Sequence, residues 1–574
     1  MDKKEIVGVL EEISSLLELK GEDKFKVSAY SRAARSISQS NLDVISLVKN
    51  GEGKKIPGIG DALSKKLSEL VDTGKLTYLE ELRKSLPEGL PDLFKIQGLG
   101  PNKVRALYEQ LDIKSISELE YACNENRLVS LKGFGQKTQD KVLAAIARQK
   151  ANSEYHLLDI VNETATRIAG MLEKLSGAER YQFTGSYRRC REIVGDIDCL
   201  IKFKSGERDK LFASLQKLKG VREVKEVQND LVSVVWENGI PVEFIIVNKA
   251  EYPYAVLHSS GSKEFFRAFK EYASSRGFTL GQREMKRGRD KIQFDSEEEI
   301  FGHVGLQYVP PELRESEEAV VAASKGEIPE LVKEEDIRGL FHVHTNWSDG
   351  AESLEDMVAE ARKLGFQYMG LSDHSKSAFY ANGLDEKRLK EQAAIVDKLN
   401  KGFEDFWIFK GSEVDILTDG KLDFSDSVLK TLDFAVGSVH SKLSMKKEEA
   451  TKRLSAAIKN PRMTILGHMT GRLLLGRDGY EVDIDEIIKL ASKTKTVIEI
   501  NANPHRLDMD WRYIRKAKDA GVKFVIGPDA HSRNGLSDYK YGVSMARKGW
   551  LTKDDLVNTM DVEQVKKFLK IAKG

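Results

Sequence analysis

The spacing of apolar residues changes along the 574-residue chain and divides it into regions of different expected fold. Up to about residue 150, apolar residues recur at helical intervals, as at Leu10, Ile13 and Leu17, which predicts short helices. Between about 180 and 310, β-branched runs such as residues 242–247 predict strands. From residue 337 onward, strand-like runs alternate with helical segments, which is typical of a β/α domain. A charged stretch between residues 310 and 336 has few apolar side chains and predicts a linker.

Composition and charge narrow the function classes. The formal net charge of +1, from 91 Lys and Arg against 90 Asp and Glu, excludes a uniformly basic DNA-coating protein and an acidic solvating tail. No apolar stretch approaches the roughly 18 residues that span a bilayer, and the N-terminal residues show no signal-peptide pattern. The three cysteines form no C-x-x-C pair, so we expect a reducing, cytoplasmic location.

Three segments of the N-terminal region share a glycine–apolar–glycine pattern, and each precedes a helical run with lysines. Glycine allows a tight turn that brings backbone N–H groups against a phosphate, and the following helix N-terminus favours the anion. Such contacts position DNA and carry little sequence information. Loop glycines in an ordinary helical domain are the simpler alternative, but three copies favour a DNA-binding region. The six glycines are Gly58, Gly60, Gly98, Gly100, Gly133 and Gly135.

Nine side chains that can bind metal ions lie at or near the ends of predicted strands after residue 337. A closed β/α barrel collects the C-terminal ends of its strands at one mouth, so these side chains are expected to meet there. Nine ligands exceed the three or four that one ion usually takes. Two or three ions sharing carboxylates would suit phosphoester hydrolysis, whereas separate core or surface histidines are the alternative. The nine are His342, His344, Asp349, His374, Glu413, His440, His468, Asp529 and His531.

On these residues, the segment 337–574 resembles a PHP domain (polymerase and histidinol phosphatase). The resemblance implies a distorted seven-stranded β/α barrel with up to three ions of Mn²⁺ and/or Zn²⁺. It implies three ligand sets: His342, His344, Glu413 and Asp529 for one ion; Glu413, His440 and His468 for the second; Asp349, His374 and His531 for the third. Imidazoles suit zinc and carboxylates suit manganese, so the metal stays open. Arg506 could contact a phosphate or be a surface arginine.

A second constellation lies between residues 185 and 198. Asp196 and Asp198 stand two positions apart in a predicted strand, so they face the same way and can share divalent ions. The preceding turn of Gly185 and Ser186 offers backbone N–H groups and a hydroxyl to phosphates, and Arg189 adds charge. Together these residues resemble the nucleotidyltransferase palm of DNA polymerase family X, although ordinary surface carboxylates are the alternative reading.

This resemblance implies a third carboxylate on a neighbouring strand, to accept the primer hydroxyl proton and to bind the catalytic Mg²⁺. Glu243 is the available residue, where the family usually has Asp. Its extra methylene could displace the carboxylate by about 1 Å, which can cost on the order of 100-fold in rate. Phe266 stands where the family has an Asn that reads the nascent base pair, and Lys270 replaces a template-side arginine. We therefore expect weak, low-fidelity or absent synthesis.

The first 75 residues resemble the small lyase-like domain of family X, in which Lys66 matches the Schiff-base lysine that removes a deoxyribose phosphate. An amine nucleophile needs a depressed pKa, which sequence does not show. Lys65 and Lys66 have the simpler alternative of solvated helix lysines or phosphate contacts.

The order of these parts resembles the bacterial and archaeal family X DNA polymerases with a C-terminal PHP domain. The resemblance implies a DNA repair enzyme that joins gap-filling synthesis, with Mg²⁺, to a metal-dependent 3′–5′ exonuclease, with abasic-site endonuclease and 3′-phosphatase action as further possibilities. We expect gapped or nicked duplex DNA, its 3′ ends and dNTPs as partners, no membrane, and a monomer. The expected domains are a lyase-like helical domain (1–80), a fingers-like helical region (81–150), an α+β palm (151–250), a thumb (251–315), a linker (316–336) and the barrel (337–574).

Two other functions stay open at this point. The palm could be a non-catalytic module that holds DNA for a nuclease. Alternatively, the barrel could hydrolyse a small phosphate ester, as histidinol phosphatase does, although the three hairpins argue for DNA.

Overall fold

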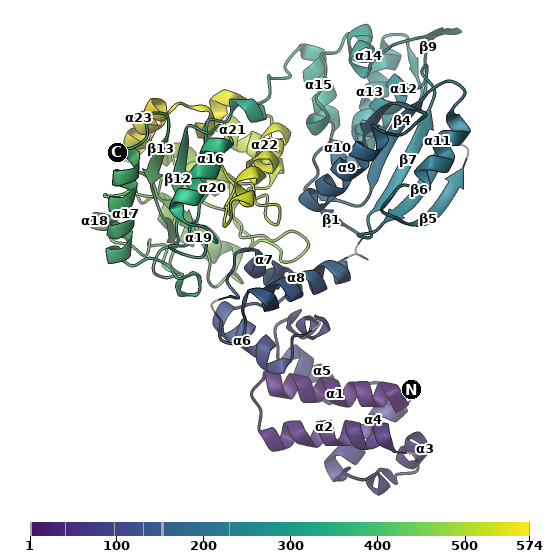
Figure 1. Cartoon of the computed structure of the whole chain (residues 1–574), viewed down its shortest axis with the longest axis vertical. Helices are drawn as coiled ribbons and strands as arrows, with labels where there is room; N and C mark the ends of the chain where they lie inside the picture. The colour runs from purple at the N-terminus through teal and green to yellow at the C-terminus, as the bar shows by residue number, and fades with distance from the viewer. Residues whose placement is uncertain are drawn as a thin grey trace. The chain divides into compact units, whose positions relative to one another are not determined.

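The computed structural model describes residues 3–40, 42–96, 98–129, 131–150, 154–228 and 230–572. The chain divides into two compact units, of which the first ends at Ile146 and the second begins at Ala147 (Figure 1). The predicted fold class is confirmed, because the first unit is helical and the second contains a palm-like α+β region and a β/α barrel. Among the described residues, no helix combines the length and the apolar character needed to cross a bilayer.

The first unit consists of short helices that each bury one apolar face. Helix α1 (Lys3–Leu19) buries Leu10, Ile13 and Leu17, as their helical spacing predicts, and packs along α2 (Lys24–Gln39). One apolar core lies among α1 to α5 and a second lies mainly within residues 90–146. The further helices are α3 (Val44–Lys49), η1 (Gly53–Lys55), α4 (Asp61–Thr73), α5 (Thr77–Lys84), η2 (Leu90–Lys95), α6 (Pro101–Leu111), α7 (Ile116–Asn124) and α8 (Gln136–Lys150).

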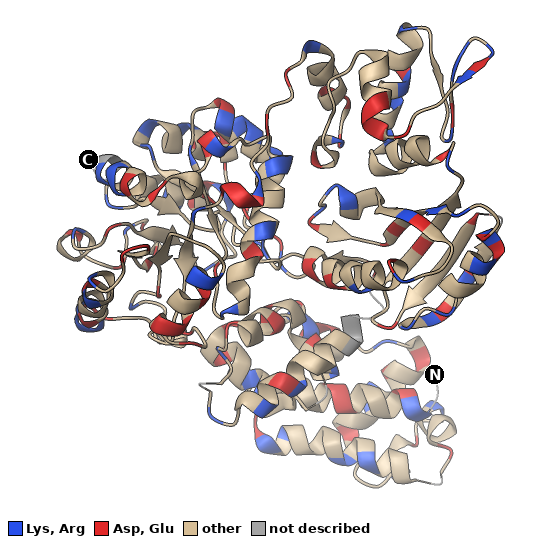
Figure 2. Ribbon diagram, turned by 45° about the horizontal axis from the view of Figure 1, so that its top comes forward, with Lys and Arg blue, Asp and Glu red and all other residues tan. Residues whose placement is uncertain are grey.

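Acidic and basic residues are interspersed along the helices of the first unit (Figure 2). Lys54, for example, forms an ion pair with Asp61 in the first turn of α4. Contacts with an anionic partner would therefore depend on local groups and not on the overall charge of this unit.

The second unit begins with the predicted palm, a five-stranded mixed sheet in the order β2-β4-β7-β6-β5. Its central strands β4 (Ile197–Phe203) and β7 (Pro241–Val247) run parallel. Helices α9 (Leu158–Leu172) and α11 (Arg208–Leu215) bury apolar residues in the same core as the sheet. The remaining elements are β1 (His156–Leu157), β2 (Ala178–Phe183), α10 (Gly185–Arg188), β3 (Ile193–Val194), β5 (Val221–Gln228) and β6 (Leu231–Trp236).

The thumb region follows with its own apolar core. It comprises α12 (Tyr252–Ser260), α13 (Lys263–Ser275), β8 (Thr279–Leu280), β9 (Met285–Arg287), β10 (Asp290–Ile292), α14 (Glu297–Val304) and η3 (Pro311–Leu313).

The segment predicted as a linker, residues 316–336, is not a loose connection. It forms helix α15 (Glu317–Lys325), which buries Ala319, Val320 and Ala323 in the thumb core, and Ile328 and Leu331 lie in the same core. The correction has a simple cause. The few apolar residues of this charged segment fall on one helical face, so a low average hydrophobicity still leaves an amphipathic helix. A short 3₁₀ turn, η4 (Glu334–Asp336), leads into the barrel.

The last domain is the predicted barrel, with helices around parallel strands (Figure 1). Two sheets, β11-β12-β13 and β14-β15-β16-β17-β18, are bridged at His374 with Glu413 and at Val343 with Ala530. The third of the seven expected strands is split into β13 and β14 at Gly411, where a Cβ would overlap the Phe434 ring. The strands are β11 (Gly339–Val343), β12 (Tyr368–Leu371), β13 (Trp407–Lys410), β14 (Glu413–Asp415), β15 (Val436–Ser438), β16 (Ile465–Leu466), β17 (Val497–Asn501) and β18 (Phe524–Gly527).

Helices of the barrel alternate with these strands, as the sequence predicts. They are α16 (Leu354–Lys363), η5 (Phe379–Ala381), α17 (Glu386–Asn400), α18 (Asp426–Leu429), α19 (Lys447–Ile458), α20 (Ile484–Thr494), α21 (Trp511–Asp519), η6 (Asn534–Asp538), α22 (Tyr539–Lys548), η7 (Lys553–Asp555), η8 (Val557–Thr559) and α23 (Val562–Ala572).

Candidate metal centre and nucleotide site

The nine expected ligands of the barrel converge at one mouth, and Glu413 lies at their centre. Its carboxylate oxygens lie between 2.9 and 3.6 Å from a nitrogen of five imidazoles, those of His342, His344, His374, His440 and His468. All of these side chains are buried or nearly so. A carboxylate with two oxygens directed at different histidines has the geometry expected of a group that bridges metal ions.

A second carboxylate, that of Asp529, lies close to both His342 and His344, at the end of the first strand. Asp529 Oδ1 lies 3.4 Å from His342 Nε2 and 3.3 Å from His344 Nε2. His342 and Asp529 have left-handed backbone φ values of 63° and 53°, and the β11–β12 register shifts between Leu340 and Val343. Such conformations cost of order 1–3 kcal/mol each and are typical of functional sites. The irregular backbone of β11 is part of what directs both imidazoles at the same carboxylate.

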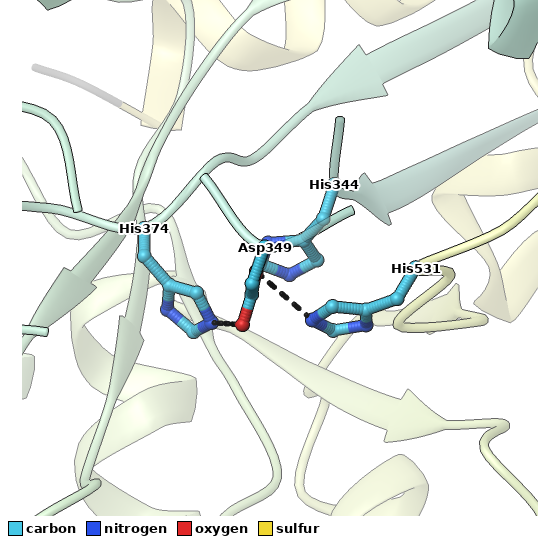
Figure 3. Close-up of side chains that lie close together, drawn as sticks. All are labelled: His344, Asp349, His374 and His531. Carbon is cyan, nitrogen blue, oxygen red and sulfur yellow. Dashed lines mark ion pairs between the residues drawn. The ribbon is translucent and has the colours of Figure 1, made fainter. Parts of the chain in front are cut away.

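A third group lies around Asp349 (Figure 3). Its carboxylate oxygens lie 3.5 Å from His374 Nε2 and 3.3 Å from His531 Nε2, and His344 Nδ1 is 3.8 Å away. Potential ligand atoms of these four residues all lie within 4.8 Å of one another. The structure therefore brings together the third expected set and adds His344 to it.

Buried groups of the pocket fit divalent cations. Within the described part of the chain, His342 Nε2, His344 Nε2 and Glu413 Oε2 are buried and make no hydrogen bond. Burial works against the charged imidazole, yet Glu499, Asp529 and Glu413 raise the pKa of His342 well above its usual value. Burial and the neighbouring His531 lower the pKa of His344 to about 3. A polynuclear metal site requires imidazoles and carboxylates whose ligand atoms are not already engaged in hydrogen bonds with one another, and this pocket contains such atoms.

Two buried carboxylates were not predicted from the sequence, and both orient a histidine. Glu499 Oε1 lies 2.5 Å from His342 Nδ1, and Asp415 Oδ1 lies 2.5 Å from His440 Nδ1. With the Nδ1 proton held in this way, Nε2 of each ring is left for the pocket. A signal was present, because Glu499 lies within the buried strand β17 and Asp415 follows Glu413 at the two-residue spacing of a strand face.

A third unpredicted carboxylate, Asp373, holds the loop that carries Asp349. It accepts hydrogen bonds from the Thr345 N–H at 2.8 Å, the Ser348 hydroxyl at 2.6 Å and Gln392 at 2.7 Å. Nothing in the sequence separates this role from that of an ordinary polar residue beside a ligand.

Arg506 is a pocket residue and not a surface arginine. Its side chain is 5% exposed, and its Nε lies 3.6 Å from Asp529 Oδ2. The positive charge also contributes, after burial, to the low pKa of His468, which falls to about 3.

The palm carboxylates lie together on the central strands. The β4–β7 register places Asp198 directly opposite Glu243, and Asp196 precedes β4. Burial, Asp196 and Glu243 raise the pKa of Asp198 to about 7. The pKa values of Asp196 and Glu243 are raised by burial first, and that of Glu243 also by Asp196. Three carboxylates that resist ionising side by side are typical of a cation site.

The predicted phosphate turn touches this cluster directly. A Cβ at Gly185, whose φ is 64°, would overlap the carboxylate of Asp198, so only glycine fits there. Ser186 follows in α10 and is partly exposed.

Arg189 lies near the carboxylates but is only 13% exposed. Its Nη1 donates to the carbonyl of Ser260 at 3.3 Å, and its Nε lies 3.4 Å from Glu315 Oε1. Both distances are long for such groups, so the guanidinium is near the site without being firmly held.

The thumb residues that depart from the family lie on α13. Phe266 packs edge-on against His258, with ring centroids 4.6 Å apart, and Lys270 is exposed. Phe266 therefore presents an apolar surface and lacks the amide expected of a base-reading residue.

The three glycine–apolar–glycine segments share one turn. The first glycine of each has a left-handed φ of 81°, 93° or 90°, and the second stands directly before α4, α6 or α8. At none of the six glycines would a Cβ meet a heavy atom within 4 Å, apart from its chain neighbours. The space beside these six α-carbons is therefore open, which is what a close approach of a phosphate to the turn requires. The turn hydrogen bonds run from Ile59 N to Ile56 O, Leu99 N to Ile96 O and Phe134 N to Leu131 O.

Lys66 differs from its neighbour Lys65. Lys65 is exposed, whereas Lys66 is partly buried, with Nζ 2.5 Å from the Tyr30 hydroxyl and 3.1 Å from the centroid of the Tyr78 ring. Burial and the charge of Lys26 lower the pKa of Lys66. This environment favours a nucleophilic amine more than a solvated lysine does.

Comparison with known proteins gives matches along the chain. Residues 1–76 match the model of a helix-hairpin-helix domain, 90–148 a SAM-like helix-hairpin-helix tandem, 255–315 the DNA polymerase beta thumb and 341–503 the PHP domain. The chain is 38% identical, over 99% of its length and 100% of the relative, to the DNA polymerase/3′–5′ exonuclease PolX of Bacillus subtilis (strain 168).

Two further relatives each match less than half of this chain. A probable phosphatase of Thermoanaerobacter sp. (strain X514) is 30% identical over 40% of this chain and 93% of its own length. DNA polymerase lambda of Arabidopsis thaliana is 25% identical over 46% of this chain and 53% of its own length.

Proposed function

Because this chain belongs to the family X DNA polymerases with a C-terminal PHP domain, we propose that it trims DNA 3′ ends in the barrel and adds nucleotides in the palm. The observation that carries the proposal is Glu413, whose two carboxylate oxygens face five buried imidazoles. Such a centre suits hydrolysis of a phosphodiester.

In the barrel, the nine ligands would hold up to three ions of Mn²⁺ and/or Zn²⁺, with Glu413 shared. Bound ions would activate water and stabilise the departing 3′ oxygen. Glu499 and Asp415 keep the Nδ1 protons of His342 and His440, so that Nε2 faces the pocket. Arg506, buried beside Asp529, is positioned to bind the phosphate that is cleaved.

In the palm, Asp196, Asp198 and Glu243 would hold Mg²⁺, which would neutralise triphosphate charge. Glu243 accepts the proton of the primer 3′ hydroxyl, a role that its raised pKa supports. Gly185 and Ser186 offer a turn to the triphosphate of a dNTP, and Arg189 adds charge from beside Asp198. The longer side chain of Glu243 and the apolar Phe266 make this synthesis weak and of low fidelity.

DNA binding by the hairpin turns supports both activities. The accessible glycine turns would contact the backbone of gapped or nicked duplex DNA and leave its sequence unread. We expect a monomer in the cytoplasm.

A lyase activity of Lys66 is a second candidate, favoured by its lowered pKa. The amine would attack the aldehyde of a deoxyribose phosphate and form a Schiff base. Borohydride should trap the protein on abasic DNA, and Lys66→Arg should abolish the trapped species while Lys65→Arg keeps it. Equal trapping of both variants would refute the assignment.

One gel tests the main proposal. A 5′-labelled primer in a gapped duplex is incubated with Mn²⁺ or Mg²⁺, with and without dNTPs. We expect shortening without dNTPs and slow extension with them. Extension that is efficient and accurate with all four dNTPs would contradict the weakness assigned to the palm.

The same assay separates the alternatives. A non-catalytic palm predicts no extension by the wild type, and nuclease activity that is unchanged when Asp196 and Asp198 are both replaced by Ala. A small-ester phosphatase predicts faster release of phosphate from p-nitrophenyl phosphate than of nucleotides from a DNA 3′ end.

A further inference from the structure

A buried lysine of the barrel contacts the nucleotide loop of the palm. Lys548 ends α22 and is 2% exposed. Its Nζ donates to the backbone carbonyl of Arg189 at 2.8 Å and lies 2.7 Å from Glu315 Oε1. The Trp511 ring covers the ammonium, with the centroid at 4.3 Å. A charge buried this deeply is costly unless it is paired, so the carbonyl, the carboxylate and the ring compensate for the burial of the ammonium.

Glu315 connects this lysine to the palm and the thumb. Its second oxygen lies 3.6 Å from Arg191 Nη1, and its first lies 3.4 Å from Arg189 Nε as well as beside Lys548. Its backbone carbonyl accepts a hydrogen bond at 3.0 Å from the hydroxyl of Ser262, which caps α13. The three regions of the second unit therefore meet at one carboxylate.

Both contacts of Lys548 help to keep the Arg189 guanidinium available to a nucleotide. The carbonyl that Lys548 holds belongs to Arg189, the C-cap residue of α10, and that helix starts at Gly185 and Ser186. Lys548 also neutralises Glu315, so that Arg189 makes only a long contact with it. Without the lysine, a buried carboxylate would be left beside Arg189 and would draw the guanidinium into a full ion pair. The arginine would then turn away from a bound triphosphate.

We propose that Lys548, a barrel residue, is a positioning residue of the palm nucleotide site, and that it acts through Glu315 and the Arg189 carbonyl. The proposal rests on nucleotidyl transfer in the palm. It makes the barrel a structural part of the polymerase site as well as a separate hydrolase.

Steady-state kinetics of nucleotide addition by the full chain test this proposal. Lys548→Met should raise KM for dNTP roughly tenfold with a smaller effect on kcat, as loss of an outer positioning contact does. Trimming of 3′ ends should stay at the wild-type rate. Lys548→Arg should restore most of the affinity. In the double variant with Glu315→Gln, the KM should return toward the wild-type value, because the carboxylate that captures Arg189 is gone.

A matched control breaks another ion pair between the barrel and the preceding helix. Arg515 Nη1 lies 2.9 Å from Glu318 Oε1 and contacts neither Arg189 nor Glu315 in the described structure. Arg515→Met should leave KM unchanged. An equal KM for Lys548→Met and the wild type, or an equal rise in both variants, would overturn the proposal.

Calorimetric binding of Mg·dNTP gives an independent readout. If the wild type binds Mg·dNTP but adds no nucleotide to a primer, the proposed polymerase activity is refuted. The positioning role of Lys548 is then still tested by the dissociation constants of the variants for Mg·dNTP. If Lys548→Met does not fold, the Glu315→Gln and Lys548→Arg proteins decide instead. The first should bind Mg·dNTP at least as tightly as the wild type, and weaker binding by it would refute the proposed capture of Arg189.

Discussion

The barrel pocket and the palm site collect acidic side chains in opposite electrostatic settings. In the barrel, imidazoles stand between the carboxylates, so that despite burial the pKa of Glu413 falls well below its usual value while that of His374 rises well above it. Among the described palm residues, no imidazole contributes to the pKa of Asp198. Burial and repulsion by Asp196 and Glu243 raise that pKa to about 7 although Arg189 acts in the opposite direction. In the barrel, neighbouring imidazoles stabilise the ionised carboxylates. In the palm, the ionised carboxylates need divalent cations from solution.

The strongest test of this contrast removes the shared carboxylate of the barrel. Glu413→Ala should lower 3′-end trimming by more than about 100-fold, because the variant lacks the group that faces all three ligand sets. Metal content per chain, measured by plasma mass spectrometry, should fall together with the activity. Primer extension by the same protein serves as the control and should persist. Retained metal with full trimming would show that Glu413 is not the bridge.

The reciprocal change is Asp198→Asn in the palm. Primer extension should fall by about 100-fold or more, because the nucleotide and the primer end lose a shared charged contact. Trimming of 3′ ends should be unaffected, and that activity shows that the protein is folded. Parallel loss of both activities would mean that the two regions do not work separately.

A smaller effect is expected from the carboxylates behind the histidines. Glu499→Gln and Asp415→Asn should each reduce trimming by roughly 10- to 100-fold, the usual effect of removing such a partner. Added Mn²⁺ should rescue part of the loss, because the imidazoles remain and only their orientation is freed. Asp405→Asn, which affects an exposed ion pair with Arg362, is the matched control. Variants as active as that control would leave Glu499 and Asp415 without the orienting role.

The smallest effect is on stability. The pKa of Asp198 is raised in the folded chain, so its ionisation disfavours folding, and stability falls as the pH rises from about 4 to about 7. In metal-free buffer, Asp198→Asn should therefore melt higher than the wild type at pH 8, by roughly 2–6 °C, and not at pH 4. Mg²⁺ should narrow the difference by stabilising the wild type. A constant difference at both pH values would contradict the charge repulsion assigned to the palm.

The sequence predicts best those parts of the molecule in which the functional residues recur at regular positions along the chain. The candidate ligands fall at the ends of successive strands, and the glycine turns repeat, so both can be found without knowledge of distant contacts. The alternation of strand sides predicts that His342 and His344 lie together, but the irregular backbone at His342 contributes to their direction. Asp415 and Glu499 were overlooked because a carboxylate behind a ligand looks like any other strand residue. The sequence predicts a linker at α15 because its apolar residues are few among many charged ones. The role of Lys548 is not predictable from the sequence, because its hydrogen-bond partners lie more than 230 positions away.

Helix α15 has a practical consequence for dividing the protein. Ile328 and Leu331 pack with the thumb, while the Val332 N–H donates to the Leu551 carbonyl of the barrel. A truncation at residue 316 would strip the thumb of apolar cover, and one after Leu331 would keep that cover but still remove Lys548. A recombinant polymerase fragment cut at either point would lack a contact that the full chain has. We therefore expect its rate of nucleotide addition to be lower than that of the intact enzyme.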